Sequence, residues 1–543
     1  MVLDGAGLDA DAVTRIADRT AVPTVPPEAL ARADRSWRAA RQAAAAGRMY
    51  GRHTGVGANR LVPVSDEDQA GQDLRLLRSH AGGVGALLPA RQVRAALAVR
   101  ANQALAGGSA LQPAVVQALV EALRLGVHPA VSEYGAVGTG DLTALAETGL
   151  ALIGERPWLH EDVERQPDPA DAFREGPWPS PLSSSSPSPS LSPSSDPSSD
   201  GEVPPSADGL DPAAVPAPFP GRVTLQQGDA LALMSSGAFT LGQAALVCHD
   251  LDILLRASHA VTALSLAAVS GSLEAYAAPA LAIRPYPGAL HAGAEVRRLL
   301  GVPDRPRATG RRIQDPYGFR AFPQVHGPAL EAAWTLRRIL DVEVNCPSEN
   351  PLIGEEGPDG GPVAYHHGGF MATPVGLALD HLCLAVLQTA QLSAARLTAF
   401  GDPGITGLRS YLAGGSAASS GMMILEYSAN SALAEIRASA VPASAGHAVL
   451  SRGVEEAASF ASQATRQALR AVDAYRLVLA CELVAAVRAL RLHPALPALS
   501  AGDGTHAPVF AVLDSALPTA TEDRALTPDV SLAADLLPEL AAL

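Results

Sequence analysis

The sequence predicts a mainly α-helical protein whose core is a bundle of long helices. Alanine and leucine dominate its apolar residues, whereas aromatic residues make up only 4% of the 543 residues. Long stretches also repeat apolar residues at helical spacing, and segments with the alternating pattern of a strand are short and few. These features favour helices, because alanine and leucine are strong helix formers while aromatic and β-branched residues are enriched in strands.

Four helices are expected within the first 125 residues. Helical patterns cover residues 27–46, 68–81, 89–106 and 113–125. Proline stands in the opening turn of the first helix, where its missing amide hydrogen has no intrahelical partner to lose. Gly126 follows the fourth helix at the position where a left-handed glycine commonly ends a helix.

The remaining helices are longer and more apolar. A helix over residues 141–152 is expected to begin at Asp141, whose side chain can cap its first turn. Apolar periodicity then covers residues 229–270, 328–340, 374–397 and 454–490. Helices of this kind bury their apolar faces against one another, so a long-helix bundle with peripheral loops is the predicted architecture.

Composition excludes several classes of function. The net charge is −15 and no basic block occurs, so nucleic acid and anionic membrane surfaces are not expected partners. The chain contains no lysine, which excludes a lysine-bound pyridoxal phosphate and a lysine-containing phosphate-binding loop. Any electrophile that acts on an amino acid must therefore come from another source.

The cysteines and the N-terminal segment predict a cytoplasmic protein. The four cysteines are far apart and lack metal-ligand spacing, so we expect no metal site and buried thiols in a reducing compartment: Cys248, Cys346, Cys383 and Cys481. No basic region followed by an apolar run opens the chain, so a signal peptide is not expected. The apolar stretch 230–247 is followed at once by charged residues, which favours a core helix over a membrane span.

One segment does not fit the bundle. Residues 177–206 are rich in serine and proline and carry too few apolar side chains to order themselves. We expect a disordered surface insertion, with a linker role favoured over a regulatory or docking role. The insertion lies within an N-terminal region, residues 1–222, and the long-helix bundle with the C-terminal helices occupies residues 223–543.

The most informative segment reads GAVGTGDLTALAETGL at residues 135–150. It resembles the signature G-S-V-G-A-S-G-D-L-x-P-L-A-H of the aromatic amino-acid ammonia-lyases, the histidine and phenylalanine ammonia-lyase family. In that family the A-S-G triplet cyclises into a methylidene-imidazolone (MIO), an electrophile. Here the segment is one residue shorter, and Gly138-Thr139-Gly140 stands before Asp141.

Other segments carry the same resemblance over nearly the whole chain outside the insertion. Family-like motifs occur in the same order: YGRHTGVG at 50–57, LRSHAGGVG at 77–85, QDPYGFR at 314–320, PQVHG at 323–327, NCPSENP at 345–351 and SRGVEEAAS at 451–459. Several ordered matches are far more specific than one short motif. The resemblance therefore implies a helical bundle of the histidine ammonia-lyase type with a loop-rich N-terminal region.

The resemblance also implies roles for particular residues. Tyr50 matches the catalytic base, and a tyrosine with an ordinary pKa near about 10 needs positive charge or hydrogen-bond donors nearby to act as one. Arg320 matches the residue that grips the substrate carboxylate, to which a guanidinium fork is suited. The other implied site residues are Gln314 and Tyr317 beside the MIO and substrate, Glu455 and His80 near the substrate amine or ring, Phe370 as an aromatic wall, and Ser235 in place of the asparagine that binds the MIO oxygen.

Each of these residues also fits a structural role. Tyr50 could merely end a helix, and Arg320 could be a surface arginine. Glu455 beside Glu456 could be a solvated helix glutamate. A lone histidine on a helix, such as His80, is usually structural, and Phe370 suits a core position equally well.

Several departures from the family pattern concern the chemistry. The triplet Gly138-Thr139-Gly140 keeps a nitrogen, a carbonyl and a hydroxyl in the order that cyclisation needs, but threonine would leave an ethylidene group. If Gly138 is the glycine before the triplet, the missing residue is the triplet's alanine. Further family residues are replaced by His53, Glu147, Val454, Met371 and Thr373.

Three functions remain open from these observations. The first is an ammonia-lyase or aminomutase for an aromatic or related amino acid, with an atypical MIO-like group and no external cofactor. The second is an MIO-independent elimination, addition or cyclisation in specialised metabolism that uses Tyr50. The third is a non-catalytic homologue. The resemblance implies a homotetramer in which several subunits build each site around a small amino-acid-like substrate.

Overall fold

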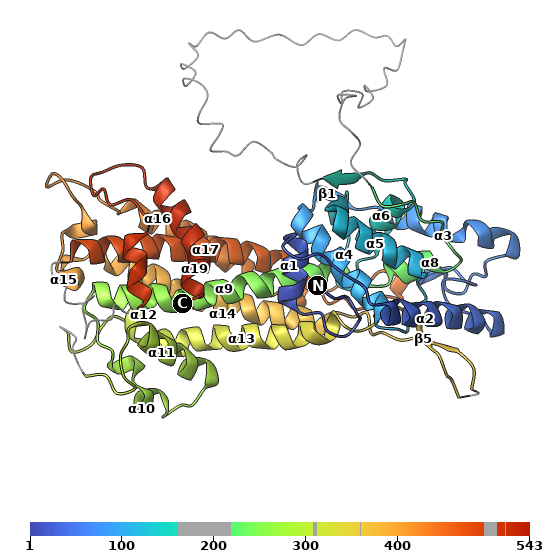
Figure 1. Ribbon diagram of the computed structural model, residues 1–543, viewed down its shortest axis with the longest axis horizontal. Helices are drawn as coiled ribbons and strands as arrows, with labels where there is room; N and C mark the ends of the chain where they lie inside the picture. Colours follow the sequence, from blue (N-terminus) through green and yellow to red (C-terminus); the bar gives the residue numbers. More distant parts are fainter. Residues whose placement is uncertain (161–218, 308–311, 359, 494–507, 516) are drawn as a thin grey trace, which may run out of the picture.

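The computed structural model describes residues 1–160, 219–307, 312–358, 360–493, 508–515 and 517–543. The predicted insertion at 177–206 lies outside the described residues. Figure 1 shows long helices side by side along the longest axis, with shorter helices gathered at one end around the N-terminal region. The prediction of a mainly α-helical bundle is confirmed.

Four helices form the centre of the bundle, and each packs against at least two of the others. They are α9 (Ala238–Ala268), α13 (Phe322–Glu343), α14 (Thr373–Ala399) and α17 (Ala461–Leu492). Around them lie α10 (Ala278–Leu281), α11 (Pro287–Leu299), α12 (Tyr317–Arg320), α15 (Pro403–Thr406), α16 (Ile424–Ser439) and α19 (Thr527–Ala541).

The end of the molecule that contains the N-terminal region has shorter helices, and three small antiparallel sheets occur among the described residues. Its helices are α1 (Ala10–Ala17), α2 (Pro27–Ala46), α3 (Asp66–His80), α4 (Ala90–Leu105), α5 (Pro113–Leu125), α6 (Leu142–Leu152) and α8 (Asp229–Met234). The strand pairs are β1 (Val84–Leu87) with β3 (Ser132–Tyr134), β2 (Val127–Pro129) with β4 (Trp158–His160), and β5 (Leu352–Gly354) with β6 (Val363–Tyr365). The predicted helix at 113–125 has the expected bounds, and Gly126 is left-handed at φ +73°.

A buried ion pair lies in the middle of the bundle. Glu482 on α17 and Arg396 on α14 are fully buried, with Arg396 Nε 2.5 Å from Glu482 Oε1. The hydroxyls of Ser265 and Ser393 each donate to this carboxylate at 2.6 Å. Arg396 also donates to the carbonyl oxygen of Gly318 at 3.0 Å, so the pair links α9, α14 and α17 to the short helix α12.

Two long predicted helices begin or break elsewhere. The segment 229–270 forms α8 and α9, which are separated by residues 235–237. The segment 454–490 becomes helical only at Ala461, after Phe460 has adopted a left-handed backbone at φ +50°. Both places lie beside the loop that contains the triplet: the Asp141 N–H donates to the Ser236 carbonyl at 2.7 Å, and the Phe460 N–H donates to the Val137 carbonyl at 2.9 Å.

The expected capping role of Asp141 is wrong. Its side chain makes no capping hydrogen bond at the start of α6. Both carboxylate oxygens instead accept hydrogen bonds from Thr240 on α9, one from the backbone N–H at 2.8 Å and one from the hydroxyl at 2.9 Å. Burial raises the pKa of Asp141, while these hydrogen bonds oppose the shift.

The cysteines and the longest apolar helices are mostly buried. Cys248, Cys383 and Cys481 are buried free thiols as predicted, whereas Cys346 is only partly buried. Within the described residues, two segments are long and apolar enough to cross a membrane by length and composition, Asp229–Ala268 and Thr373–Ala399. The first is almost entirely buried, which is how a core helix is distinguished from a membrane span.

Histidines lie within the bundle core beside the ion pair. The rings of His259 on α9 and His326 on α13 are 4.8 Å apart between centroids. His326 bonds with the Thr389 hydroxyl at 2.9 Å and with the Leu255 carbonyl at 3.1 Å. Burial lowers the pKa of His259 to about 3 and that of His326 well below its ordinary value, so both are neutral in the folded protein.

We predict that Glu482→Gln strongly destabilises the protein, because it leaves the Arg396 guanidinium buried without a counter-charge. The expected loss is about 3–5 kcal/mol of unfolding free energy. Asp34→Asn, which breaks the exposed Arg38–Asp34 pair of α2 at 2.9 Å, should cost less than about 1 kcal/mol and is the matched control. Denaturant unfolding measures both, and an equal effect of the two variants would contradict the role of the buried pair.

We predict that His259 makes the fold acid-sensitive. Its folded pKa of about 3 lies below the unfolded value of about 6.5, so between these values only the unfolded chain binds the proton. Stability is therefore intact above pH 6.5 and falls by up to about 1.4 kcal/mol per pH unit below it for this residue. His259→Phe should flatten the stability–pH curve between pH 6 and pH 4, measured by denaturant unfolding, and an unchanged slope would refute the prediction.

Candidate active site

One cavity brings five of the sequence-predicted site residues together. It has a volume of about 580 Å³ and lies where α6, α8 and several loops meet. The predicted residues in its lining are Tyr50, Thr139, Ser235, Phe370 and Glu455. Side chains from five separate parts of the sequence therefore converge on one volume, and we take this cavity as the candidate active site.

Tyr50 enters the cavity from the loop that follows α2. The backbone N–H of Gly57 donates to its hydroxyl oxygen at 2.7 Å, which favours the deprotonated phenolate. Burial nevertheless raises the pKa of Tyr50 above its usual value, and the nearby carboxylate of Glu455 adds to the rise. Arg60, which also lines the cavity, lowers the pKa. The loop thus supplies both a donor and a cation to the phenol.

Glu455 reaches the same cavity from a turn, not from a helix. Residues 451–453 form a short 3-10 turn, and Leu450 and Glu455 pair across it as an isolated bridge. The hydroxyl of Ser451 donates to the Glu455 carboxylate at 2.6 Å. A Cβ atom on Gly57 would lie 3.3 Å from that carboxylate, so Glu455 packs directly on the loop of Tyr50. The alternative of a solvated helix glutamate is wrong.

The loop that carries the triplet is anchored by the chain entering α17. Gly138 and Gly140 are both left-handed, with φ values of +82° and +101°. Three consecutive carbonyl oxygens accept hydrogen bonds from this entry segment: Ala136 from the Ser462 hydroxyl at 3.0 Å, Val137 from the Phe460 N–H at 2.9 Å, and Gly138 from the Ser459 hydroxyl at 2.6 Å. These contacts hold Thr139 at the cavity wall.

The space around Gly138 leaves no room for a side chain. An added Cβ would lie 2.2 Å from the Ser459 hydroxyl oxygen and 2.7 Å from the backbone nitrogen of Ala461. Alanine therefore cannot replace Gly138 without moving the backbone. Position 138 therefore requires glycine in this structure.

The atoms that an MIO ring requires are nevertheless present. Ring closure uses the carbonyl of the first residue, the nitrogen of the third and the hydroxyl of the second, and it does not use the alanine methyl group. Gly138 supplies the carbonyl, Gly140 the nitrogen and Thr139 the hydroxyl. The three residues therefore carry the functional groups that an MIO ring needs, and threonine adds one methyl group.

A second buried ion pair lies next to the lining of the cavity. Arg100 on α4 and Glu349 are 1% and 2% exposed, and their charged atoms are 2.6 Å apart. The next residue, Asn350, lines the cavity and donates its backbone N–H to the Ser235 hydroxyl at 3.0 Å. Ser235 is therefore fixed at the break between α8 and α9, where the family has an asparagine.

Two histidines after β6 complete one wall. His367 accepts a hydrogen bond from the Gly369 N–H at 2.8 Å and bonds with the Glu349 carbonyl at 2.7 Å, which shapes the loop leading to Phe370. His366 lines the cavity and accepts a 3.4 Å hydrogen bond from the backbone N–H of Tyr50. Arg60 and His366 could not be predicted, because no motif distinguishes them from ordinary loop residues. Asn350 lies within the motif at 345–351, but no role was predicted for it.

Four predicted residues lie outside this cavity within the chain. His80 is at the end of α3, where its Nδ1 bonds with the Leu76 carbonyl at 2.9 Å. Gln314, Tyr317 and Arg320 lie at and before α12, at the opposite end of the molecule from α2 and α8 (Figure 1). Tyr317 is 70% exposed, and the Arg320 guanidinium lies 4.5 Å above its ring. One chain alone does not bring these side chains to Tyr50.

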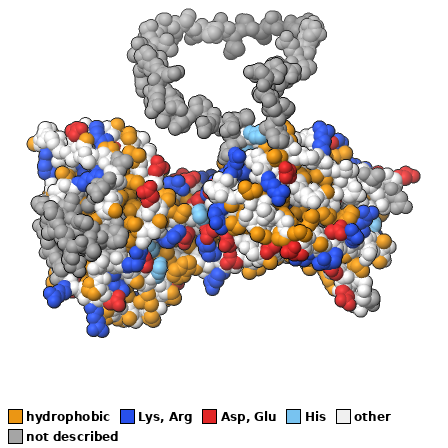
Figure 2. All heavy atoms as spheres, viewed as in Figure 1, with side chains coloured by type: hydrophobic (Ala, Val, Ile, Leu, Met, Phe, Trp, Pro, Cys, Tyr) orange, Lys and Arg blue, Asp and Glu red, His pale blue; other side chains and the backbone are white. Residues whose placement is uncertain are grey.

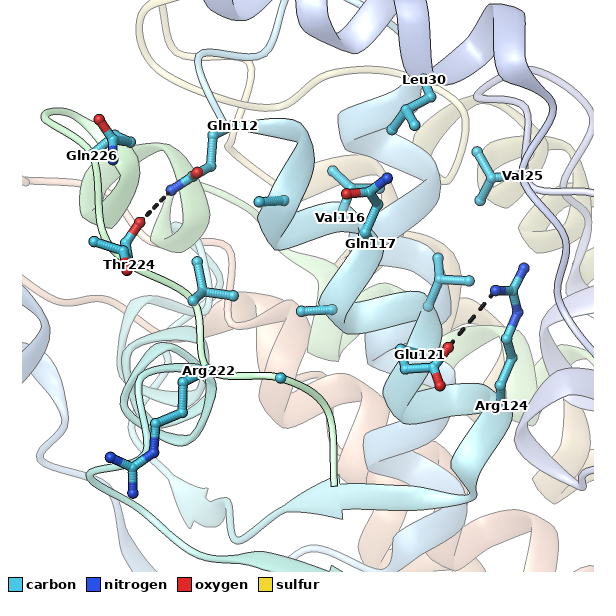
Figure 3. A pocket seen from close by; sticks show the side chains of 15 residues that line it. Val25, Leu30, Gln112, Val116, Gln117, Glu121, Arg124, Arg222, Thr224 and Gln226 are labelled. Carbon is cyan, nitrogen blue, oxygen red and sulfur yellow. Dashed lines mark hydrogen bonds and ion pairs between the residues drawn. The ribbon is translucent and has the colours of Figure 1, made fainter. Parts of the chain in front are cut away.

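A larger hollow lies on the outer side of α5. It has a volume of about 740 Å³ and contains none of the predicted site residues. Figure 3 shows that its charged side chains Glu121 and Arg124 point toward one another, at 3.8 Å, and that Gln112 bonds with the Thr224 carbonyl. Because none of the predicted site residues lines this hollow, the Tyr50 cavity remains the candidate active site.

Metal ligation is not supported in the part of the chain that the structure describes. There, no group of three or more histidine, cysteine, aspartate or glutamate side chains is arranged to hold a metal ion.

Comparisons with known proteins identify the family of the chain. A family model described as aromatic amino acid lyase matches residues 8–512. The histidine ammonia-lyase of Geobacillus kaustophilus is 31% identical over 81% of this chain and 79% of its own length. Two solved structures cover 99% of this chain with TM-scores of 0.80: the histidine ammonia-lyase of Trypanosoma cruzi, 24% identical over 93% of its chain, and the tyrosine aminomutase of Streptomyces globisporus, 25% identical over 97% of its chain. The chain therefore belongs to the aromatic amino acid lyase family of carbon–nitrogen lyases.

Proposed function

We propose that the protein is an ammonia-lyase or aminomutase for an aromatic or related amino acid, with an MIO-like electrophile made from Gly138-Thr139-Gly140. The observation that carries the proposal is the convergence of Tyr50, Thr139 and Glu455 on one cavity. Its relatives include histidine ammonia-lyases and an aminomutase. No external cofactor is needed, and pyridoxal phosphate has no lysine to bind.

The side chains of the cavity suit the separate tasks of this reaction. Tyr50 removes the β-proton of the substrate, and the Gly57 N–H stabilises the phenolate that does so. Glu455, on the opposite side of the phenol loop, attracts the substrate ammonium group. An MIO-like group at Thr139 would supply the electrophile that makes the amine a better leaving group. Phe370 and Leu231 supply apolar wall for a ring.

We propose that Arg320, which would bind the substrate carboxylate, reaches the cavity from another copy of the chain. Arg320 is at the far end of the subunit from Tyr50, and Tyr317 and Gln314 are exposed beside it. Apolar side chains are also exposed along the bundle, including Leu377 and Leu384 on α14, at 56% and 44%. Figure 2 shows such apolar surface over the bundle as well as over the N-terminal region. A cytoplasmic homotetramer in which Arg320 of one subunit faces Tyr50 of another accounts for both features.

A second candidate is an elimination that uses Tyr50 without the electrophile. Ser235 favours it, because a serine hydroxyl held by the Asn350 N–H replaces the asparagine amide implied at this position. The two candidates differ at Thr139, which is essential only if the ring forms.

We predict that the purified protein has lost two water molecules from residues 138–140, detected by intact mass and by mapping the peptide that contains the triplet. Thr139→Ala has no hydroxyl to lose, so it cannot form the exocyclic double bond, and it should no longer release ammonia from a panel of aromatic amino acids. Full activity of Thr139→Ala would establish the MIO-independent candidate. A wild-type protein without any turnover would instead favour a non-catalytic homologue.

We predict that Tyr50→Phe lowers kcat/KM by roughly 100- to 10,000-fold, the range for loss of a general base. In the wild type kcat/KM should rise with pH into the alkaline range, because the base must be deprotonated and burial raises its pKa. Glu455→Gln removes a charge that raises the pKa of Tyr50, so the rise of kcat/KM with pH should occur at lower pH. Glu456→Gln is the control, since Glu456 lines the cavity but is not among the charges that shift Tyr50. Equal pH profiles for both glutamine variants would contradict the assignment.

We predict that Tyr50→Phe and Arg320→Ala complement one another when co-expressed. Each variant alone should be nearly inactive, but mixed oligomers contain some sites with both wild-type residues. Activity of the co-expressed pair should therefore exceed the sum of the separate variants. The same test with Tyr50→Phe and Thr139→Ala is the control, because these residues share one cavity in one chain and cannot complement. Absence of complementation in the first pair would argue against a shared site.

A further inference from the structure

The carbonyl group of Gly138 has an unusual set of hydrogen-bond donors. The buried hydroxyl of Ser459 donates to its oxygen at 2.6 Å. The backbone N–H of Ala372, at the start of α14, donates to the same oxygen at 3.4 Å. Two donors from two different helix entries thus converge on the carbonyl at which the triplet would close its ring.

The orientation of the Ser459 hydroxyl is set by a third contact. The backbone N–H of Ala461 donates to the Ser459 oxygen at 3.3 Å, so this oxygen already accepts one hydrogen bond. Its own hydrogen is then directed at Gly138. Ser459 is 4% exposed, and a hydrogen bond in such a water-excluded place stabilises negative charge more strongly than it would in water.

Ring closure places negative charge on this oxygen. The Gly140 nitrogen attacks the Gly138 carbonyl carbon, a nitrogen–carbon bond forms, and the carbonyl oxygen becomes an alkoxide. That alkoxide takes the Gly140 amide proton, and the hydroxyl then leaves as water with the amide hydrogen of Thr139. Thr139 next loses its hydroxyl and its Cα hydrogen as a second water, which creates the exocyclic double bond. No oxidant or further reactant is required.

We propose that Ser459 is a maturation residue, whose hydroxyl, together with the Ala372 N–H, forms an oxyanion hole for autocatalytic cyclisation of Gly138-Thr139-Gly140. This inference rests on the proposed function, in which the ring forms. Ser459 acts on the chain's own backbone before any substrate binds.

The chain offers a matched control in Ser462. Its hydroxyl donates to the Ala136 carbonyl at 3.0 Å, so it ties the same helix entry to the same loop, but at a carbonyl that does not react. Ser459 and Ser462 are both 4% exposed. Ser459→Ala and Ser462→Ala each remove one anchoring hydrogen bond, and only the former removes a donor from the reacting group.

The test is the intact mass of each full-length variant, followed at intervals after the start of expression, with peptide mapping of the triplet and a thermal melt as a check of folding. Wild type and Ser462→Ala should lose two waters quickly. Ser459→Ala should do so about 100-fold more slowly, the usual cost of one oxyanion-hole donor. Ser459→Cys, a weaker donor of similar size, should be intermediate, and it decides the question if Ser459→Ala does not fold.

Each outcome decides the proposal. Water loss at the wild-type rate in Ser459→Ala or Ser459→Cys overturns it and leaves the proposed function intact. Equal slowing in Ser459→Ala and Ser462→Ala also overturns it, because the hydroxyls would then only hold the loop in place. An unmodified wild type removes both the inference and the electrophile of the proposed function.

Discussion

The arrangement of the site depends on how α17 is held in the bundle. Its middle residue Glu482 pairs with Arg396 in the fully buried core, and its entry segment binds the triplet loop through three consecutive carbonyls. About 20 residues separate these two contacts, which is roughly 30 Å of helix. A rigid helix therefore connects the ion pair to the loop, and a loop rich in glycine acquires a defined position.

The second buried ion pair plays the same part for the other side of the cavity. Arg100 anchors Glu349, whose neighbour Asn350 binds Ser235 and whose carbonyl binds His367. Charges buried in this way are costly unless every polar atom has a partner, and removing one partner is strongly destabilising. The two buried ion pairs thus fix the positions of the triplet loop and of the segment around Asn350. Tyr50 and Glu455 approach one another on loops between these two parts of the cavity. The departures from the family pattern, Thr139 and Ser235, lie at this junction.

Much of the fold could be predicted from periodicity, because long apolar helices dominate it. The convergence of Tyr50, Thr139, Phe370 and Glu455 could be predicted only from the ordered motifs, since these residues are far apart in sequence. The capping role assigned to Asp141 failed because Thr240, a distant residue, offers two better donors. Arg60 and His366 carry no motif, and the distance of Arg320 from Tyr50 depends on the tertiary arrangement of the subunit.

A crystal structure of the purified protein at near-atomic resolution tests the central claim most directly. Electron density for Gly138, Thr139 and Gly140 should show a bond between the Gly138 carbonyl carbon and the Gly140 nitrogen. It should also show a planar Thr139 Cα, with the Ser459 hydroxyl beside the new ring. An open backbone with a tetrahedral Thr139 Cα and an intact hydroxyl would contradict the account and leave Tyr50 to act without an electrophile.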